Sequence, residues 1–366
     1  STDKKRTVRL LPRGNWMDDT GEIIRPALPS YLPALGIAPS EGSASGGEVR
    51  ELNRLDLARW LVAPGHPLTA RVTMNRLWKQ FFGTGLSKVL DDLGAQGEPP
   101  VHPELLDYLA AEFVEAGWDI KHMVRRIVSS QTYRQTSAVT PELLARDPYN
   151  REHARQTAFR MDAELIRDYA LSVSHLLNDA IGGPSIKPYQ PDGYWENLNF
   201  PQRTYSADLD RNQYRRGLYV WWQRSFLHPS LLAFDAPTRE ECCAERTRSN
   251  IPQQALVLMN DPTYMEAARN LAVRILREAD GSSSLRIRWA VRQVLQREAR
   301  DEEVETLLQA FSEHHAQYSG KQKSAFALLQ HSGQSEVPSD LNQVELAAWT
   351  HVARILLNLH ETITRN

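Results

Sequence analysis

Apolar residues recur at helical spacing along most of the chain from Arg54 onward. Residues 103–117 begin with a proline at the first helical position and end at a glycine, which are typical boundaries of a helix. Residues 261–278 begin with Asp261 as a cap and Pro262 at the first helical position. Similar patterns predict further helices over residues 54–63, 66–83, 119–133, 161–178, 283–298, 301–318 and 340–366, the last with Leu346, Trp349, Val352, Ala353 and Leu356 on one face.

Strand signals are few. Residues 215–226, rich in tyrosine, valine and tryptophan, are the best strand candidate, and residues 6–11 form a shorter one. Residues 90–102 and 180–202 are rich in glycine and proline, and long loops of this kind in a compact domain serve a site or an interface. The pattern therefore predicts a mainly α protein, a multi-helix orthogonal or bundle-like domain with one or two short strands and long irregular loops.

Composition separates a short N-terminal segment from the rest of the chain. Residues 1–50 are rich in proline, glycine and serine, and they predict an extended N-terminal arm or a linker from a preceding domain. Residues 51–366 predict one helical domain, and a subdivision near residues 180–235 stays open as an alternative.

Charge and motifs exclude several classes of function. The formal net charge of −2 gives no electrostatic reason to bind nucleic acid. No apolar run is long enough to span a membrane, and the N-terminal residues lack the apolar segment of a signal peptide. The sequence has no phosphate loop, serine-nucleophile elbow, HExxH or CxxCH, so it predicts no metal site and no cofactor in this chain. The pair His314–His315 is expected on a solvated helix face.

Two polar clusters in the N-terminal half are candidate sites. Arg71, Asn75 and Trp78 share one face of a predicted helix, where they either line a pocket or fasten neighbouring loop carbonyls. Glu98 and His102 lie in the glycine- and proline-rich loop that enters the helix at Pro103. They either carry function or brace the loop, with His102 at the helix cap.

A third cluster joins an aromatic loop to residues 235–261, DAPTREECCAERTRSNIPQQALVLMND. Tyr194 and Trp195 are suited to stacking on sugar rings or bases. The charged residues that follow either form an internal ion-pair network or bind an anion, because arginine pairs with carboxylate, sulfate or phosphate through two hydrogen bonds. The candidate residues of this segment are Asp235, Arg239, Glu240, Arg246, Arg248 and Asn250.

Seven ordered blocks of the sequence resemble one family. They include RLDLARWLVAPGHPLTARVTMNRLWKQFFGTGL, LGAQGEPPVHPELLDYLAAEF, GWDIKHMVRRIVSSQTYRQTS and residues 235–261. Together they resemble the planctomycete-specific C-terminal domain of unknown function, which is found in exported proteins of Planctomycetes and Verrucomicrobia. Cys242 matches that family's pattern and the adjacent Cys243 departs from it, which argues against a paired-thiol function.

The resemblance implies an extracytoplasmic protein of which this chain is one part. It implies a companion planctomycete-specific domain and often a cytochrome c-like domain, so that haem c belongs to a companion and not to this chain. It also implies a role in polysaccharide use, but it supplies no activity and no catalytic residues.

Three functions follow as alternatives. The leading one is a helical module that packs on its companion domain and helps to bind or process a glycan or other organic substrate. The second is a polysaccharide hydrolase or lyase that uses two carboxylates from Glu98, Asp235 and Glu240. The third is a structural scaffold in which buried charge networks fix the packing.

Overall fold

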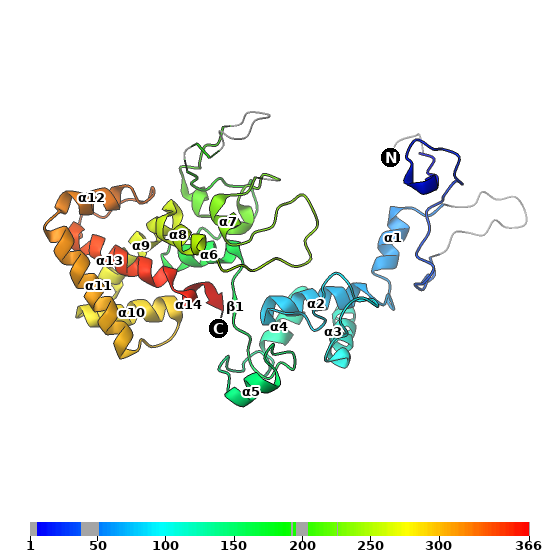
Figure 1. Ribbon diagram of the computed structural model, residues 1–366, viewed down its shortest axis with the longest axis horizontal. Helices are drawn as coiled ribbons and strands as arrows, with labels where there is room; N and C mark the ends of the chain where they lie inside the picture. Colours follow the sequence, from blue (N-terminus) through cyan, green and yellow to red (C-terminus); the bar gives the residue numbers. More distant parts are fainter. Residues whose placement is uncertain (1–5, 38–50, 192, 195–203, 225, 366) are drawn as a thin grey trace, which may run out of the picture. The chain divides into compact units, whose positions relative to one another are not determined.

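The computed structural model describes residues 6–37, 51–191, 193–194, 204–224 and 226–365, and these residues are mainly α-helical, as the sequence predicts (Figure 1). The chain divides into two compact units, Ser1–Thr157 and Ala158–Asn366. Within the described ranges, no helix is long and apolar enough to cross a membrane.

The first unit is built around three helices, α2, α3 and α4, whose apolar faces form its core. Met74, Phe82 and Met123 are fully buried there. The helix α2 ends where Gly83 takes the left-handed conformation with φ of 76°, a stop that the sequence predicts. The elements are the 3₁₀-helix η1 (Pro12–Gly14) and the helices α1 (Arg54–Leu61), α2 (Thr69–Phe82), α3 (Pro103–Glu115), α4 (Ile120–Val128) and α5 (Pro141–Arg146).

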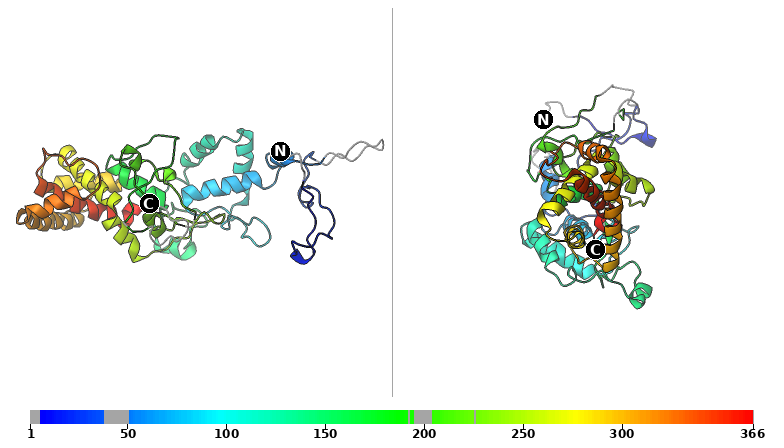
Figure 2. Two further views of the ribbon diagram at one scale, coloured as in Figure 1. Left: turned by 90° about the horizontal axis from the view of Figure 1, so that it is seen from above. Right: turned by 90° about the vertical axis from the view of Figure 1, so that its left-hand side faces the viewer.

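The second unit is a helical assembly with α13 at its centre, in contact with α8, α9, α10, α11 and α12 (Figures 1 and 2). The five apolar residues predicted on one face of this helix are all fully buried. The elements are β1 (Phe159–Arg160), α6 (Ala163–Val173), η2 (Arg211–Tyr214), η3 (Gly217–Tyr219), α7 (Pro229–Ala233), α8 (Pro252–Asn260), α9 (Pro262–Glu278), α10 (Ser283–Leu295), α11 (Asp301–Ser319), α12 (Gln322–Gln330), α13 (Gln343–Asn358), α14 (His360–Ile363) and β2 (Thr364–Arg365).

The strand prediction for residues 215–226 is wrong. The described part of this segment forms the 3₁₀-helix η3 and isolated bridges, while the two-residue strands β1 and β2 pair antiparallel. Long-range contacts override the local preference, because Gly217 lies against α6 and donates its backbone N–H to Asp168 at 2.6 Å. A Cβ atom at Gly217 would come within 2.7 Å of the Glu164 side chain. Residues 6–11 likewise form only one isolated bridge, between Arg9 and Ile23.

Several predicted helices are shorter than expected, among them those predicted over residues 119–133 and 283–298, which end at Val128 and Leu295. The helix predicted over residues 340–366 is interrupted, because Leu359 takes an extended conformation between α13 and α14. The helix predicted over residues 161–178 ends at Val173. His175 then takes a positive φ of 59°, which turns the chain away from the helix axis.

Candidate functional site

Two residues of the first predicted cluster fasten loops. Asn75 is buried, and its side-chain amide donates to the Ser87 carbonyl at 2.8 Å and accepts from the Ser87 N–H at 2.9 Å. Arg71 donates to Asp107 at 2.6 Å and to the Pro67 carbonyl at 2.5 Å. These side chains therefore satisfy the polar groups of the segments that enter α2 and α3.

A cavity of about 420 Å³ lies beside the N-terminal end of α3, and both Trp78 and His102 line it. We call it the α3 cavity. His102 stands at the cap position of α3, but its side chain makes no capping hydrogen bond. The remaining walls come from Glu104, Leu105, Thr132, Glu152 and His153.

Two of the side chains that line the α3 cavity carry ring nitrogens that lack partners. Trp78 stacks on Phe82 with ring centroids 4.1 Å apart, and the rings of Trp78 and His153 meet edge to face with centroids 5.1 Å apart. Among the described residues, Trp78 Nε1 and His153 Nδ1 are both buried without a hydrogen-bond partner. Such groups are rare in folded proteins, because each loses its hydrogen bonds to water on burial.

His153 is neutral in this environment. Burial, together with repulsion from the neighbouring His102, lowers its pKa to about 4. The two imidazole rings lie 6.2 Å apart. A neutral imidazole offers one donor and one acceptor, so His153 is suited to a hydroxyl group rather than to an anion.

Glu98 lines a different cavity, of about 270 Å³, together with Arg71. Its carboxylate forms an ion pair with Arg151, and its backbone carbonyl accepts from the Ser87 hydroxyl at 3.0 Å. Arg71 is paired with Asp107, so the charged groups of this cavity are already engaged. The second predicted cluster is thus split, with His102 in the α3 cavity and Glu98 in a braced loop.

In the second unit, the charged segment, residues 235–250, is held by internal pairs. Asp235 has a positive φ of 61° and accepts hydrogen bonds from Arg160, from the Ser249 N–H at 2.8 Å and from its hydroxyl at 2.7 Å. Burial opposes ionisation of Asp235, but the hydrogen bonds from Ser249 and Arg160 outweigh it and hold the pKa below its usual value. Arg246 donates to both carboxylate oxygens of Glu164, at 2.6 and 3.1 Å.

The other candidates in this segment lie near the surface. The guanidinium of Arg239 lies 4.5 Å from the Trp222 ring centroid, and that of Arg248 lies 5.0 Å from the Phe159 ring centroid. Glu240, Asn250 and both cysteines are exposed. The arginines therefore have separate partners: Glu164 for Arg246, Trp222 for Arg239 and Phe159 for Arg248.

The predicted aromatic platform is described only in part. Tyr194 donates its hydroxyl to the Leu227 carbonyl at 3.1 Å and packs on Phe226 with ring centroids 4.7 Å apart. Trp195 lies outside the described residues. Tyr194 thus serves an internal contact.

We expect Arg246 to contribute more to stability than Arg239. Replacing Arg246 with alanine should lower the free energy of unfolding by about 1–2 kcal/mol, because two hydrogen bonds to a partly buried carboxylate are lost. Replacing Arg239 with alanine should cost about 0.5–1 kcal/mol, since it removes an exposed cation–π contact. Urea denaturation followed by circular dichroism measures both, and a larger loss for Arg239 would contradict the assignment of Arg246 as the brace.

Sequence patterns did not single out two features of the second unit. One is Glu266, a fully buried carboxylate on α9 that four hydrogen-bond donors surround. Its position on the apolar face of a predicted helix was the available signal. The other is a cavity of about 340 Å³, the Asp208 cavity, which includes Asp208, Asp210 and Asn212 at alternate positions of the sequence. Within the described ranges, no three potential metal-binding side chains gather at one point.

Fold and cavities together define a mainly α protein of two units, each with a pocket of the size that holds a small ligand. The chain belongs to the PSD1 family, described as protein of unknown function (DUF1553), whose model matches residues 53–311, more than half of its length. Searches of curated proteins and of solved structures gave no significant match.

Proposed function

We propose that this chain is a glycan-binding helical module of an extracytoplasmic multidomain protein, and that a neutral sugar binds in the α3 cavity. The observation that carries the proposal is the pair of partnerless ring nitrogens, Trp78 Nε1 and His153 Nδ1, on side chains that line one cavity. A bound hydroxyl group would accept from the indole N–H and pair with the neutral imidazole.

The remaining lining supports a neutral, hydroxylated ligand. Glu104 and Glu152 place carboxylates at the cavity, and carboxylates accept hydrogen bonds from hydroxyl groups while repelling sulfate or phosphate. Of these two carboxylates, Arg146 pairs with that of Glu152 alone, with the nitrogen and oxygen 2.6 Å apart. The cavity volume of about 420 Å³ is within the range of small-molecule sites.

The wider context remains part of the proposal. We infer that the parent protein also carries the companion planctomycete-specific domain and a cytochrome c-like domain, and that the bound glycan is processed by that assembly. This chain contains no CxxCH, so haem c would be held by the companion.

The pairing of the carboxylates weighs against the hydrolase or lyase alternative. Glu98 is engaged by Arg151, Asp235 is engaged by Arg160, and Glu240 is exposed. Glycoside hydrolysis needs one carboxyl group that is protonated as the general acid, and an arginine partner favours the ionised form of a carboxyl group. For the charged segment, the scaffold alternative is favoured by the bonds of Arg246 to Glu164.

Replacing Trp78 with phenylalanine tests the proposal, because phenylalanine keeps an aromatic ring on Phe82 but removes the indole N–H. We expect binding of neutral oligosaccharides to weaken about three- to tenfold, the worth of one hydrogen bond. Isothermal titration calorimetry with cello-, xylo- and manno-oligosaccharides measures the affinity. In the NMR spectrum, the Trp78 indole N–H signal should shift on titration.

The matched control is Trp222→Phe, because Trp222 Nε1 is also buried without a partner among the described residues but lies in the second unit. It should leave the affinity at this site unchanged. A sulfated form of the same oligosaccharide should bind more weakly. The proposal fails if no member of the panel binds, or if binding leaves the Trp78 indole signal in place.

A further inference from the structure

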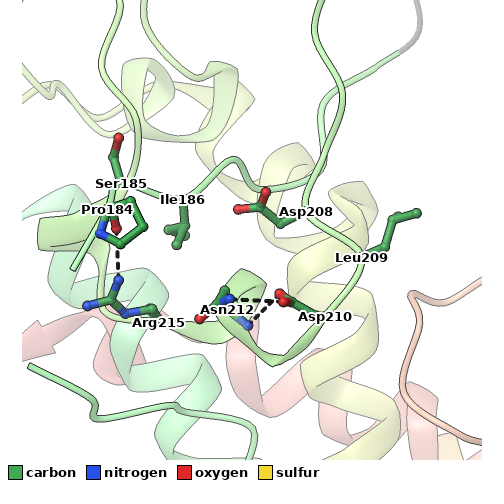
Figure 3. A pocket seen from close by; sticks show the side chains of 8 residues that line it. All are labelled: Pro184, Ser185, Ile186, Asp208, Leu209, Asp210, Asn212 and Arg215. Atoms are coloured by element: carbon green, nitrogen blue, oxygen red, sulfur yellow. Dashed lines mark hydrogen bonds between the residues drawn. The ribbon is translucent and has the colours of Figure 1, made fainter. Parts of the chain in front are cut away.

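We propose that the second unit contains a separate binding site for a neutral hydroxylated ligand, the Asp208 cavity, so that the chain holds glycan at two sites. The choice of ligand class rests on the proposed function, whereas the site itself rests on the geometry of the second unit. The cavity has a volume of about 340 Å³ and lies between residues 184–186 and 208–215 (Figure 3).

Hydrogen-bond acceptors gather on one side of this cavity (Figure 3). Asp208 Oδ2 accepts from the Lys187 N–H at 2.8 Å, which orients the carboxylate, while its Oδ1 has no partner among the described residues. Asp210 accepts from the backbone and the side chain of Asn212, both at 2.9 Å. The exposed hydroxyl of Ser185 completes a set of groups that suit sugar hydroxyls.

A buried donor, Arg215, lies beside Pro184, across the cavity from Asp208 and Asp210 (Figure 3). Arg215 is only 3% exposed and donates to the carbonyls of Pro184 at 2.8 Å, Ala180 at 3.2 Å and Gly182. Its Nε is buried and has no partner within the described part of the chain. The guanidinium of Arg215 lines the cavity as a hydrogen-bond donor, which suits a ligand hydroxyl but not a metal ion or an ammonium group.

Charge and apolar surface restrict the class of ligand that suits the Asp208 cavity. The two carboxylates outnumber the single guanidinium, so an anionic ligand is disfavoured. Ile186, only 2% exposed, and the exposed Leu209 add apolar surface for the C–H groups of a sugar ring. This combination of acceptors, one donor and aliphatic surface is typical of a site for a neutral polyol.

The site is preorganised by bonds that do not involve a ligand. Asp208 and Lys187 are joined through their backbones, with the Asp208 N–H donating to the Lys187 carbonyl at 2.9 Å. Arg167, only 2% exposed, donates to the carbonyls of Arg215 at 2.7 Å and Gln213 at 2.5 Å. Binding therefore costs little ordering of the protein. A polymer that engages both sites gains avidity that a short fragment lacks.

Two substitutions in the full chain test the site. Asp208→Asn keeps an oxygen for the Lys187 N–H but removes the charged acceptor, and Ser185→Trp fills the cavity from its exposed rim. Calorimetry with the same neutral oligosaccharides should give two sites in the unaltered protein. It should give one site in Ser185→Trp and at least tenfold weaker second-site binding in Asp208→Asn. Asp179→Asn, which removes an exposed carboxylate of the same unit outside the cavity, should change neither the number of sites nor the affinity of the second site.

NMR separates the two sites. Binding at the Asp208 cavity should shift the Ile186 methyl signals, and Ser185→Trp should abolish that shift while the Trp78 indole shift persists. If sugar shifts the Trp78 indole signal but never the Ile186 methyl signals, and calorimetry finds one site, the proposal of a second site is overturned and the proposed function stands. If sugar shifts Ile186 but not Trp78, the α3 cavity proposal fails alone. If neither signal moves, both proposals fall. Circular dichroism of each variant shows that it is folded.

Discussion

Replacing Glu266 with alanine is expected to lower the free energy of unfolding by about 3–5 kcal/mol, the cost of breaking a fully buried ion pair from one side. The carboxylate is 0% exposed and accepts from the hydroxyls of Tyr214 at 2.8 Å and Tyr189 at 3.1 Å. It also accepts from the N–H groups of Gln334 at 2.7 Å and Ser335 at 2.5 Å. Urea denaturation followed by far-ultraviolet circular dichroism measures the loss.

The size of this effect comes from what Glu266→Ala leaves behind. The guanidinium of Arg269 lies 3.7 Å from Glu266 and is 1% exposed, so its charge would stay buried without a counter-ion. The loop after α12 depends on the same carboxylate, because the N–H groups of Gln334 and Ser335 donate to it. The loop also packs closely on it, since a Cβ atom at Gly333 would come within 2.2 Å of the Glu266 carboxyl group. Loss of the carboxylate therefore frees that loop as well as two tyrosine hydroxyls.

Asp340→Ala is the matched control, because Asp340 pairs at 3.0 Å with Arg277 of the same helix α9, but both side chains are exposed, at 65% and 51%. Ion pairs at the surface contribute about 0–1 kcal/mol, so this variant should remain close to the unaltered protein. Equal losses for Glu266→Ala and Asp340→Ala would show that the buried cluster does not stabilise the second unit as we infer.

Local signals in the sequence were sufficient to predict a helix where residues typical of helix ends lie at both of its boundaries. The helix predicted over residues 261–278 is α9, and Asp261 caps it by accepting from the Thr263 N–H at 2.9 Å. The buried face of α13 could also be predicted, since its apolar spacing depends only on the helical repeat. The strand prediction for residues 215–226 was wrong because their conformation follows from contacts with α6, and local preference contains no information about such contacts.

The same limit applies to the candidate sites: residues could be named from local patterns, but their distant partners could not. Trp78 and His102 could be named from their helical face and loop, but His153, which completes the cavity wall, lies 75 and 51 positions later in the sequence. The partner of Arg246 is Glu164, 82 positions earlier, and that of Asp235 is Arg160, 75 positions earlier. The sequence could therefore show a charged segment but not choose between an internal network and an anion site, because the partners are set by tertiary folding.

Replacing Asp235 with alanine is expected to lower the free energy of unfolding by about 3 kcal/mol, because Arg160 then loses its counter-ion in a largely buried position. The side chains of Arg160 and Asp235 are only 11% and 15% exposed. Alanine also tolerates poorly the positive φ of 61° at this position. Asp235→Asn isolates the charge, because asparagine adopts positive φ more readily and keeps an oxygen for Ser249.

The charge of Asp235 makes this contribution depend on pH. Hydrogen bonds from Ser249 and Arg160, which outweigh the opposing effect of burial, hold its pKa below the value of about 3.9 expected in the unfolded chain. A carboxylate with a lowered pKa in the folded state contributes its full stability above the unfolded value and loses it as the pH falls through the folded value. The unaltered protein should therefore lose this part of its stability below about pH 4, and Asp235→Asn should lack that loss.

Urea titrations between pH 7 and pH 2 compare Asp235→Asn with Glu240→Gln, which removes an exposed carboxylate of the same segment. The stability difference between Asp235→Asn and the unaltered protein should be largest at neutral pH and shrink in acid, whereas Glu240→Gln should match the unaltered protein throughout. If the difference for Asp235→Asn stays constant with pH, the ion pair with Arg160 is not what holds the charged segment. The segment would then be free to bind an anion, and added sulfate should stabilise the unaltered protein more than a variant that lacks Arg160.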